Sequence, residues 1–351
     1  MTSPRYVVRT RPRTREKSLY VNHPSESPIL GMSLNRCWVW NSGGMNLHRS
    51  VAHMPANVLR ELAGVSVSQF AELVIELGPL WEAQRLERLS AHARHRQMGG
   101  GRKPFPFAGR LLLALVHLRW NLPFRMIGVL FGVSKDTVQR SSFEIVPLLA
   151  AYGITAPDGN RVRTGCELAE QLSRLAQDQR VTLLDGSFVP VARPKTREAQ
   201  RRIYSGYRHR YTTNFQALTD DTGSLLWVGG VRPGSTHDLT AIAESDAVQV
   251  LAATGVTVVA DKGYRGIKKR LGLNSAVIPV RRQPKNQMPR PEWVQAVVDE
   301  HNHDISRTRV RVEHAFSNMK RFRILTGYRG KTRSDITATI SAVAALASLP
   351  N

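Results

Sequence analysis

Cysteine is scarce in this sequence: of 351 residues, only Cys37 and Cys166 are cysteines. They lie far apart and show no paired spacing of metal ligands, so they support neither a zinc site nor a disulfide framework. Such sparse use of cysteine is typical of a reducing compartment, and we expect the protein in the cytoplasm.

Long apolar runs are also missing. Spanning a bilayer takes roughly 18–20 consecutive apolar residues. Runs such as residues 111–118 and 342–349 are much shorter than this and fit core helices. The arginine-rich N-terminus is followed by no apolar stretch, which is unlike a secretory signal. We therefore expect no membrane partner.

Acidic residues are few compared with basic ones. The chain has 27 Asp and Glu against 50 Lys and Arg, a formal net charge of +23. Nucleic acid is the simplest partner for such a surface, because each neutralised phosphate releases counterions. Packing against structural RNA and binding to an anionic membrane surface are the alternatives. A hydrophobic content of 42% still allows a packed core.

The chain is long enough for more than one core. Residues 1–50 mix Arg, Ser, Pro and Gly without periodicity and are predicted to be a basic, disordered tail. Because helical patterning begins only after them, we expect translation to start at Met45 or Met54. Residues 51–160 are predicted to form a helical DNA-binding region. Residues 175–345, where short β runs alternate with helices, are predicted to form a second, α/β domain.

Residues 109–145 have the pattern of a helix-turn-helix. One helix is expected to end near Trp120, a short second helix to follow Pro123, and Gly132 to supply the turn. Ser134 is suited to cap the third helix, and Val138 is expected to pack against Ile127 and Leu130. The residues expected to face DNA from the third helix are Lys135, Gln139 and Arg140. The alternative is a three-helix bundle used for protein contacts.

Two acids each follow a short apolar run. Asp185 comes after Val-Thr-Leu-Leu, and Asp261 comes after Val-Thr-Val-Val-Ala. Neighbouring strands of this kind would place the two carboxylates side by side, where they repel each other unless a cation lies between them. Taken singly, each acid is equally consistent with a turn former at a strand end.

A third acid lies on a predicted amphipathic helix over residues 307–322. At 100° per residue, Arg309, Glu313 and Lys320 fall within about 40° of one another around the helix. This face combines one acid with two bases, although Arg309 and Glu313 are also spaced as an ordinary surface ion pair. Three carboxylates suit Mg²⁺ or Mn²⁺, which prefer oxygen ligands. Two such ions can activate the attacking oxygen and stabilise the leaving oxygen of a phosphodiester exchange.

Several motifs occur in one order along residues 100–330. They are LDGSFVPV around Asp185, the run of residues 204–228, RPGSTHDL at residues 232–239, VVADKGY around Asp261 and RVEHAFSNMKRF around Glu313. Together they resemble the DDE-superfamily insertion-sequence transposases, most closely the insertion-sequence-five family and its Harbinger-like relatives. The signature Tyr-x₂-Arg-x₃-Glu-x₆-Lys of that family matches Arg309, Glu313 and Lys320, with Ser306 at the position of the tyrosine.

The resemblance implies a ribonuclease-H-like mixed-sheet catalytic domain behind the helix-turn-helix. It implies that Asp185, Asp261 and Glu313 hold two Mg²⁺ ions, that Arg309 and Lys320 contact DNA, and that the protein cuts at terminal inverted repeats before a 3′-hydroxyl attacks target DNA. A homodimer or higher oligomer on nucleoid DNA is expected. His237 and Asp238 also match, as possible accessory residues, although Asp238 is equally suited to cap a helix.

Basic residues are dense near these acids, at residues 197–210 and 262–270, and are expected to follow a phosphate backbone. Two other functions use the same features. One is a DNA-binding regulator that descends from a transposase and no longer cuts DNA. The other is a metal-dependent nuclease that only hydrolyses.

Overall fold

The computed structural model describes residues 54–91, 105–281, 283, 288–330 and 333–350. All described residues belong to one compact unit. The predicted tail, residues 1–50, and the possible start at Met45 lie outside the described residues. Within the described part of the chain, no helix is long and apolar enough to cross a membrane.

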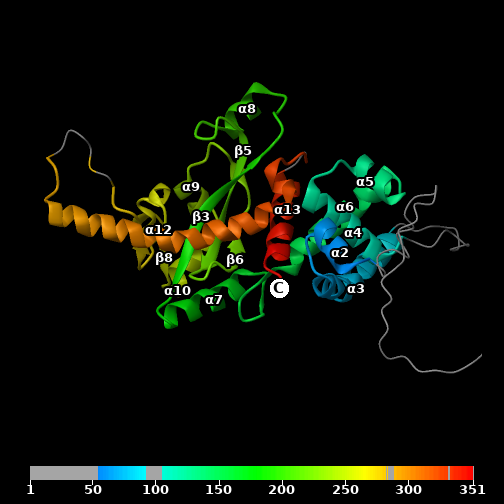
Figure 1. The fold of residues 1–351 in the computed structure, drawn as a ribbon, viewed down its shortest axis with the longest axis horizontal. Coiled ribbons are helices and arrows are strands. Elements are labelled where there is room, and N and C mark those ends of the chain that lie inside the picture. The colour runs from blue at the N-terminus through cyan, green and yellow to red at the C-terminus, as the bar shows by residue number, and fades with distance from the viewer. Residues whose placement is uncertain (1–53, 92–104, 282, 284–287, 331–332, 351) are drawn as a thin grey trace, which may run out of the picture. The chain divides into compact units, whose positions relative to one another are not determined.

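The first described region is helical (Figure 1). Its helices are α2 (Ala56–Ala63), α3 (Val67–Ala91), α4 (Phe107–Trp120), α5 (Phe124–Phe131) and α6 (Lys135–Tyr152). Of these, α3 runs for 25 residues and continues through Pro79. Leu73, Leu77 and Trp81, each four residues apart, are buried on one side of it. Their burial holds the helix together across the proline.

The predicted helix-turn-helix is present as α4, α5 and α6. Gly132 ends α5 with φ 64°, a left-handed conformation that favours glycine. The Ser134 hydroxyl accepts a hydrogen bond from the Thr137 N–H at 3.1 Å and so caps α6. Val138 and Ile127 are fully buried, as predicted. The expected packing of Leu130 is wrong: Leu130 is 39% exposed.

The reason is the rotation of α5. Phe131 follows Ile127 by four residues, which returns it to the same side of the helix, whereas Leu130 points about 60° away from that side. Phe131 is buried at 2% exposure and therefore fills the place expected for Leu130.

The second region contains a mixed seven-stranded sheet with the order β4-β5-β3-β8-β9, in which β6 and β7 also pair with β5. The strands are β3 (Val181–Pro190), β4 (Tyr204–Ser205), β5 (Arg210–Asp220), β6 (Leu225–Val228), β7 (Arg232–Pro233), β8 (Thr257–Ala260) and β9 (Ala276–Val277). β3 is antiparallel to β5 and parallel to β8, and β8 is parallel to β9. This confirms the expected α/β class, with a ribonuclease-H-like mixed sheet behind a helical region.

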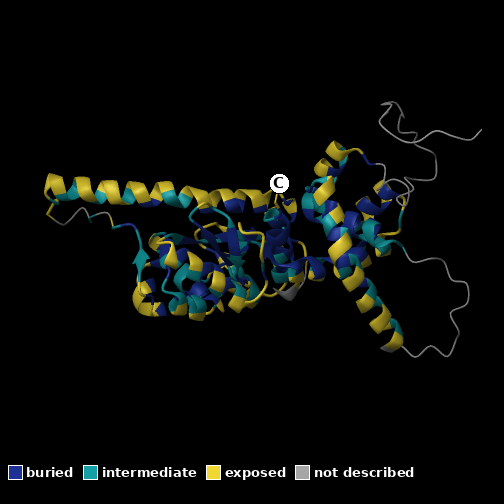
Figure 2. Ribbon diagram, turned by 90° about the horizontal axis from the view of Figure 1, so that it is seen from below, coloured by how far each residue is buried: buried dark blue, intermediate teal, exposed yellow. Residues whose placement is uncertain are grey.

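Alternate residues of β3 enter two different cores. Leu184 packs with buried side chains of α7 (Gly165–Gln177), α9 (Asp238–Ala243), α10 (Ala247–Thr254) and α11 (Ile267–Leu271). Leu183 packs with α12 (Glu292–Lys320), the 3-10 turn η2 (Arg323–Thr326) and α13 (Arg333–Ala347). Successive side chains of a strand point to opposite faces, so helices cover both faces of the sheet. Figure 2 shows the strands among buried residues.

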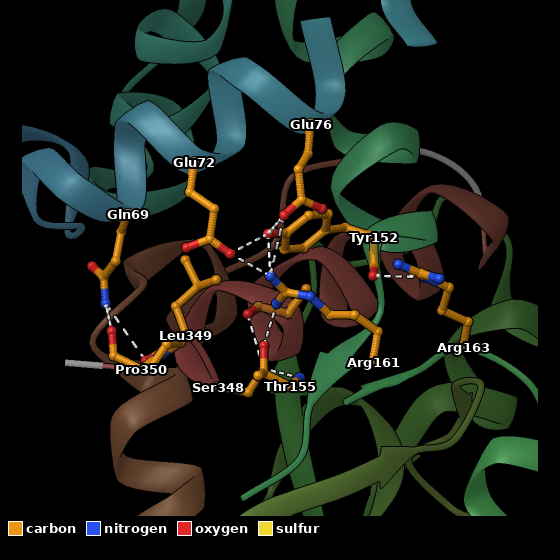
Figure 3. A network of polar contacts seen from close by, with 11 residues as sticks. Gln69, Glu72, Glu76, Tyr152, Thr155, Arg161, Arg163, Ser348, Leu349 and Pro350 are labelled. Carbon is orange, nitrogen blue, oxygen red and sulfur yellow. Dashed lines mark hydrogen bonds and ion pairs between the residues drawn. The ribbon is translucent and has the colours of Figure 1, made fainter. Parts of the chain in front are cut away.

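The core on the α12 and α13 side continues into α2–α6. A polar network lies where these elements meet the small sheet of β1 (Ile154–Thr155) and β2 (Arg161–Val162) (Figure 3). The Arg161 guanidinium bonds to Glu72 and lies 3.9 Å from the centre of the Tyr152 ring. Gln69 donates to the Pro350 carbonyl at 2.7 Å. These contacts join residues before position 160 to residues after it. The domain boundary predicted near residue 160 remains a prediction.

Candidate active site

Two of the predicted acids lie side by side. β3 and β8 are parallel neighbours with Leu184 paired to Ala260, so Asp185 and Asp261 each follow at the same level of the sheet. Asp185 was expected at a strand end, but β3 continues to Pro190 because it pairs with β5 as far as Thr212. Asp185 thus projects from the middle of β3, which is paired with β5 both before and after it.

The Asp185 carboxyl is largely buried, with 17% of the side chain exposed. Its Oδ1 accepts from the Gly186 N–H at 2.8 Å, and its Oδ2 accepts from Arg309 Nη2 at 3.1 Å. Burial raises the pKa of Asp185 to about 6, the Arg309 charge and the Gly186 bond oppose that rise, and the Asp261 charge adds to it. Burial outweighs the ion pair, so this carboxylate gains from any further cation placed beside it.

Asp261 begins the short 3-10 turn η1 (Lys262–Tyr264) directly after β8. Its Oδ1 accepts from the Gly263 N–H at 2.7 Å, which fixes one carboxylate oxygen. A Cβ atom at Gly263 would lie 2.9 Å from Asp261 Oδ1 and 3.0 Å from Asp238 Oδ2. Residue 263 must therefore be small, and Asp238 reaches the same place as Asp261.

Asp238 is not the helix cap that one interpretation predicted. The cap of α9 is His237, whose Nδ1 accepts from the Leu239 N–H at 3.3 Å, and Asp238 is the first residue inside the helix. Asp238 Oδ1 accepts instead from Asn214 Nδ2 at 2.9 Å. The exposed His237 thus caps the helix, while Asp238 turns toward the two strand aspartates.

A buried chain of polar side chains supports Asp238. The Tyr264 hydroxyl donates to Gln216 Oε1, Gln216 Nε2 donates to Asn214 Oδ1 at 2.9 Å, and Asn214 donates to Asp238. Tyr264 is fully buried, and burial, together with the charges of Asp238, Asp185 and Asp261, raises its pKa well above the usual value. The phenol therefore stays a neutral donor, and it contributes a polar contact as well as packing.

Asn214 and Gln216 were not predicted as part of the site. They are two residues apart on β5, so both point to one face, and they are 0% and 2% exposed. The sequence does contain a signal for them. It has two amide side chains at alternate positions of a strand that otherwise enters the core. Burying such groups is unfavourable unless they are hydrogen-bonded, which marks the position as a polar site.

The helix α12 brings Arg309 to this site. Arg309 contacts Asp185, and its Nε is buried without a hydrogen-bond partner. Glu313, one turn later, is exposed. Within the described residues, no three Asp, Glu, His or Cys side chains are close enough together to hold a metal ion. The structure therefore brings together Asp185, Asp261 and Arg309, and leaves Glu313 outside this cluster.

Lys320 lies at the end of α12. Burial lowers its pKa, the nearby charge of Arg208 lowers it further, and the charge of Asp185 opposes both effects. Arg208 belongs to the basic run at residues 197–210, which includes α8 (Arg197–Ile203). Positive charge from two distant parts of the sequence thus lies near Asp185, as a phosphate-binding surface requires.

The helix-turn-helix residues are placed as follows. Lys135 and Arg140 are exposed at the start of α6. Gln139 is half-buried and lines a cavity of about 700 Å³ that α4, α6 and α13 enclose together with η2. The two cations are free to meet DNA, whereas Gln139 is only partly available to it.

Comparison with known proteins agrees with this geometry. Residues 184–351 match the model of the DDE superfamily endonuclease, and residues 104–153 match the helix-turn-helix of the DDE superfamily endonuclease. The transposase for insertion sequence element IS112 of Streptomyces albus G is 32% identical over 271 residues, which are 77% of this chain and 86% of that protein. This chain belongs to the DDE superfamily endonucleases of insertion-sequence transposases.

A second relative supports the assignment. The transposase for insertion sequence element IS702 of Microchaete diplosiphon is 24% identical over 281 residues, 80% of this chain and 90% of that protein. No solved structure matches the chain. The matched endonuclease model covers Asp185, Asp261 and Glu313, and the matched helix-turn-helix contains Lys135 and Arg140. DDE endonucleases use divalent metal ions, and the transposase binds DNA through its helix-turn-helix.

Proposed function

We propose that this transposase cuts DNA at the ends of its element and joins the free 3′-hydroxyl to target DNA, using Asp185, Asp261 and Glu313 as its acids. The observation that carries the proposal is the parallel pairing of β3 and β8, which puts Asp185 and Asp261 next to each other. Two rigidly held carboxylates at one level of a sheet are a place where phosphodiester chemistry can occur.

The donor set at these positions suits a hard divalent cation. Asp185 and Asp261 offer carboxylate oxygens, and the burial of Asp185 favours a cation beside it. We propose Mg²⁺ for this role, replaceable by Mn²⁺, with two ions bound. Bound there, the ions would supply charge stabilisation for the attacking and leaving oxygens. We assign Glu313 as the third ligand from its place in the family signature, with Asp238 as the competing candidate because it already faces Asp261.

Arg309 is proposed to position DNA. Its guanidinium already donates to Asp185 through Nη2 and has an unpartnered, buried Nε. A phosphate oxygen beside Asp185 would satisfy that donor, since arginine binds phosphate with paired N–H groups. Lys320 and Arg208 would hold the backbone on either side without taking part in proton transfer.

DNA partners follow from the same elements. We propose that the helix-turn-helix binds the terminal inverted repeats through Lys135 and Arg140, with Gln139 as a candidate for base contact. The protein is proposed to act on nucleoid DNA in a bacterial cytoplasm and to assemble on DNA as a homodimer or larger oligomer.

The test is a cutting and joining assay on DNA duplexes that carry the element's own ends. We expect cut and joined products with Mg²⁺, none with a chelator, and none from D185N, D261N or E313Q. The matched control E170Q changes an exposed acid on α7 and should behave as the parent does. If D238N abolishes products and E313Q does not, Asp238 is the third ligand instead.

Two results would give the protein another function. Cut products without joined ones would make it a nuclease. Binding of the ends without any cutting, in the presence of Mg²⁺ or Mn²⁺, would make it a regulator.

A further inference from the structure

The first half of the catalytic helix α12 is exposed. From Glu292 onward the first buried residue is Ile305. The Asn302 side chain accepts a hydrogen bond from the Val280 N–H at 2.7 Å and donates one to the Val280 carbonyl at 3.3 Å. Figure 2 shows the early turns of α12 coloured mostly as exposed. We call residues 292–304 the arm of α12.

Large apolar side chains on the arm face solvent. Trp293 is 72% exposed and Val297 is 60% exposed. They are four residues apart and therefore adjacent on one side of the helix. Exposed tryptophan next to exposed valine on a helix that packs against little else is typical of a surface that binds another protein, because tryptophan is enriched in the centre of interfaces.

The arm is acidic in a basic protein. It contains Glu292, Asp299, Glu300 and Asp304, and no Lys or Arg occurs between Arg290 and Arg307. At 100° per residue from Trp293, the positions of Val297, Glu300 and Asp304 fall at about 40°, 340° and 20°. One narrow stripe thus begins with the two apolar residues and ends with two carboxylates.

This stripe excludes DNA as its partner, because carboxylates without neighbouring cations repel phosphate. It is complementary to a basic protein surface with an apolar part. The chain itself has a net charge of +23 and offers exposed cations such as Lys268, Lys269 and Arg270 on α11. Charge complementarity therefore points to a second copy of this chain as the occupant.

We propose that the arm of α12 docks on a basic surface of a second copy, with Trp293 and Val297 as the apolar contacts and Glu300 and Asp304 as the charged ones. Because α12 also carries Arg309 and Glu313, the docked arm would hold the catalytic helix of each copy in place. The interaction does not depend on whether the carboxylates cut DNA.

The test measures the mass of the full-length chain by light scattering and by sedimentation, without DNA. We expect a dimer whose dissociation constant rises about tenfold or more in W293S/V297S. The matched control is I75S, which removes an apolar side chain of the same 72% exposure from α3 and should leave the dimer unchanged. Circular dichroism of each variant checks that the fold is retained.

A second variant tests the charges. E300R/D304R should weaken the dimer as well. The dissociation constant of the parent dimer should depend on salt, and that of the variant should not. Mixing isotopically light and heavy chains before carbodiimide cross-linking should give light-to-heavy links from Glu300 or Asp304 to lysines. A parent that stays monomeric at about 50 µM, a W293S/V297S chain that dimerises as tightly, or intermolecular links that leave out the arm would overturn the proposal.

Discussion

Arg309 of α12 donates a hydrogen bond from Nη2 to Oδ2 of Asp185 at 3.1 Å, 124 positions away in the sequence. Both side chains are mostly buried, at 18% and 17% exposure. Removing one partner of such a buried ion pair is strongly destabilising, because the remaining charge stays buried without its partner. The contact fixes α12 against β3, the strand that carries Asp185.

Replacing Arg309 with Gln should reduce cutting of element ends roughly tenfold to a hundredfold, because a charge-assisted contact to phosphate and to Asp185 is lost. The measurement is the initial rate of end cleavage at DNA concentrations below saturation. Arg307→Gln, an exposed change two residues away, is the control and should retain the parent rate. Equal rates for both variants and the parent would remove Arg309 from the site.

Tyr264→Phe should lower the free energy of unfolding by about 1–3 kcal/mol, because Gln216 Oε1 would remain buried without its donor. Urea unfolding measures this change. Tyr204→Phe, at a tyrosine that is 41% exposed, should change stability by less than about 0.5 kcal/mol. If Tyr264→Phe is as stable as the parent, the hydroxyl does not support the Gln216–Asn214–Asp238 chain.

His117 should make stability depend on pH. Burial lowers its pKa below the usual value of 6.5, the hydrogen bond to the Leu122 carbonyl opposes this shift, and the Arg329 charge adds to it. The unfolded chain therefore takes up the proton first as pH falls below about 6.5, so the folded state loses stability from there down to the lowered pKa of the folded protein.

Urea unfolding of the parent and of His117→Gln between pH 7 and pH 5 checks this prediction. The stability difference between the two should shift in favour of the variant as the solution becomes more acidic. His301→Gln, at an exposed histidine, serves as the control and should follow the parent. A difference that does not change with pH would show that His117 titrates alike in the folded and unfolded chain.

Lys135→Ala and Arg140→Ala should each weaken binding of the element ends and reduce the slope of log affinity against log salt by about 1, since each removes one phosphate contact. Fluorescence anisotropy at several salt concentrations measures both effects. Arg163→Ala, at an exposed cation beside the C-terminal end of α6, serves as the comparison and should leave the slope unchanged. An unchanged slope would place Lys135 and Arg140 outside the DNA interface.

The local elements were predictable because their signals lie within a few residues. Pro123, Gly132 and Ser134 mark the helix-turn-helix, and α5 begins and ends where they indicate. The turn between β5 and β6 contains Asp221 and Gly223, and Gly223 has φ 93°. These features depend on backbone conformation and capping, which a short stretch of sequence determines.

The site was only partly predictable because it depends on distant neighbours. The apolar runs before Asp185 and Asp261 predicted two strands, but only the register between β3 and β8 makes those acids adjacent. Helical periodicity put Arg309 and Glu313 on one side of α12, yet it could not decide which of them meets Asp185. Asp238 likewise required tertiary contacts, since its Asn214 partner lies 24 residues away.

We propose above that Asp185 and Asp261 together bind the divalent ions of the reaction. The most direct measurement is binding of Mn²⁺ to the DNA-bound protein, followed by the electron paramagnetic resonance signal of free Mn²⁺. We predict that the parent and the E170Q control take up Mn²⁺ and that D185N/D261N does not at the same concentrations. Equal uptake by D185N/D261N and the parent would contradict the account.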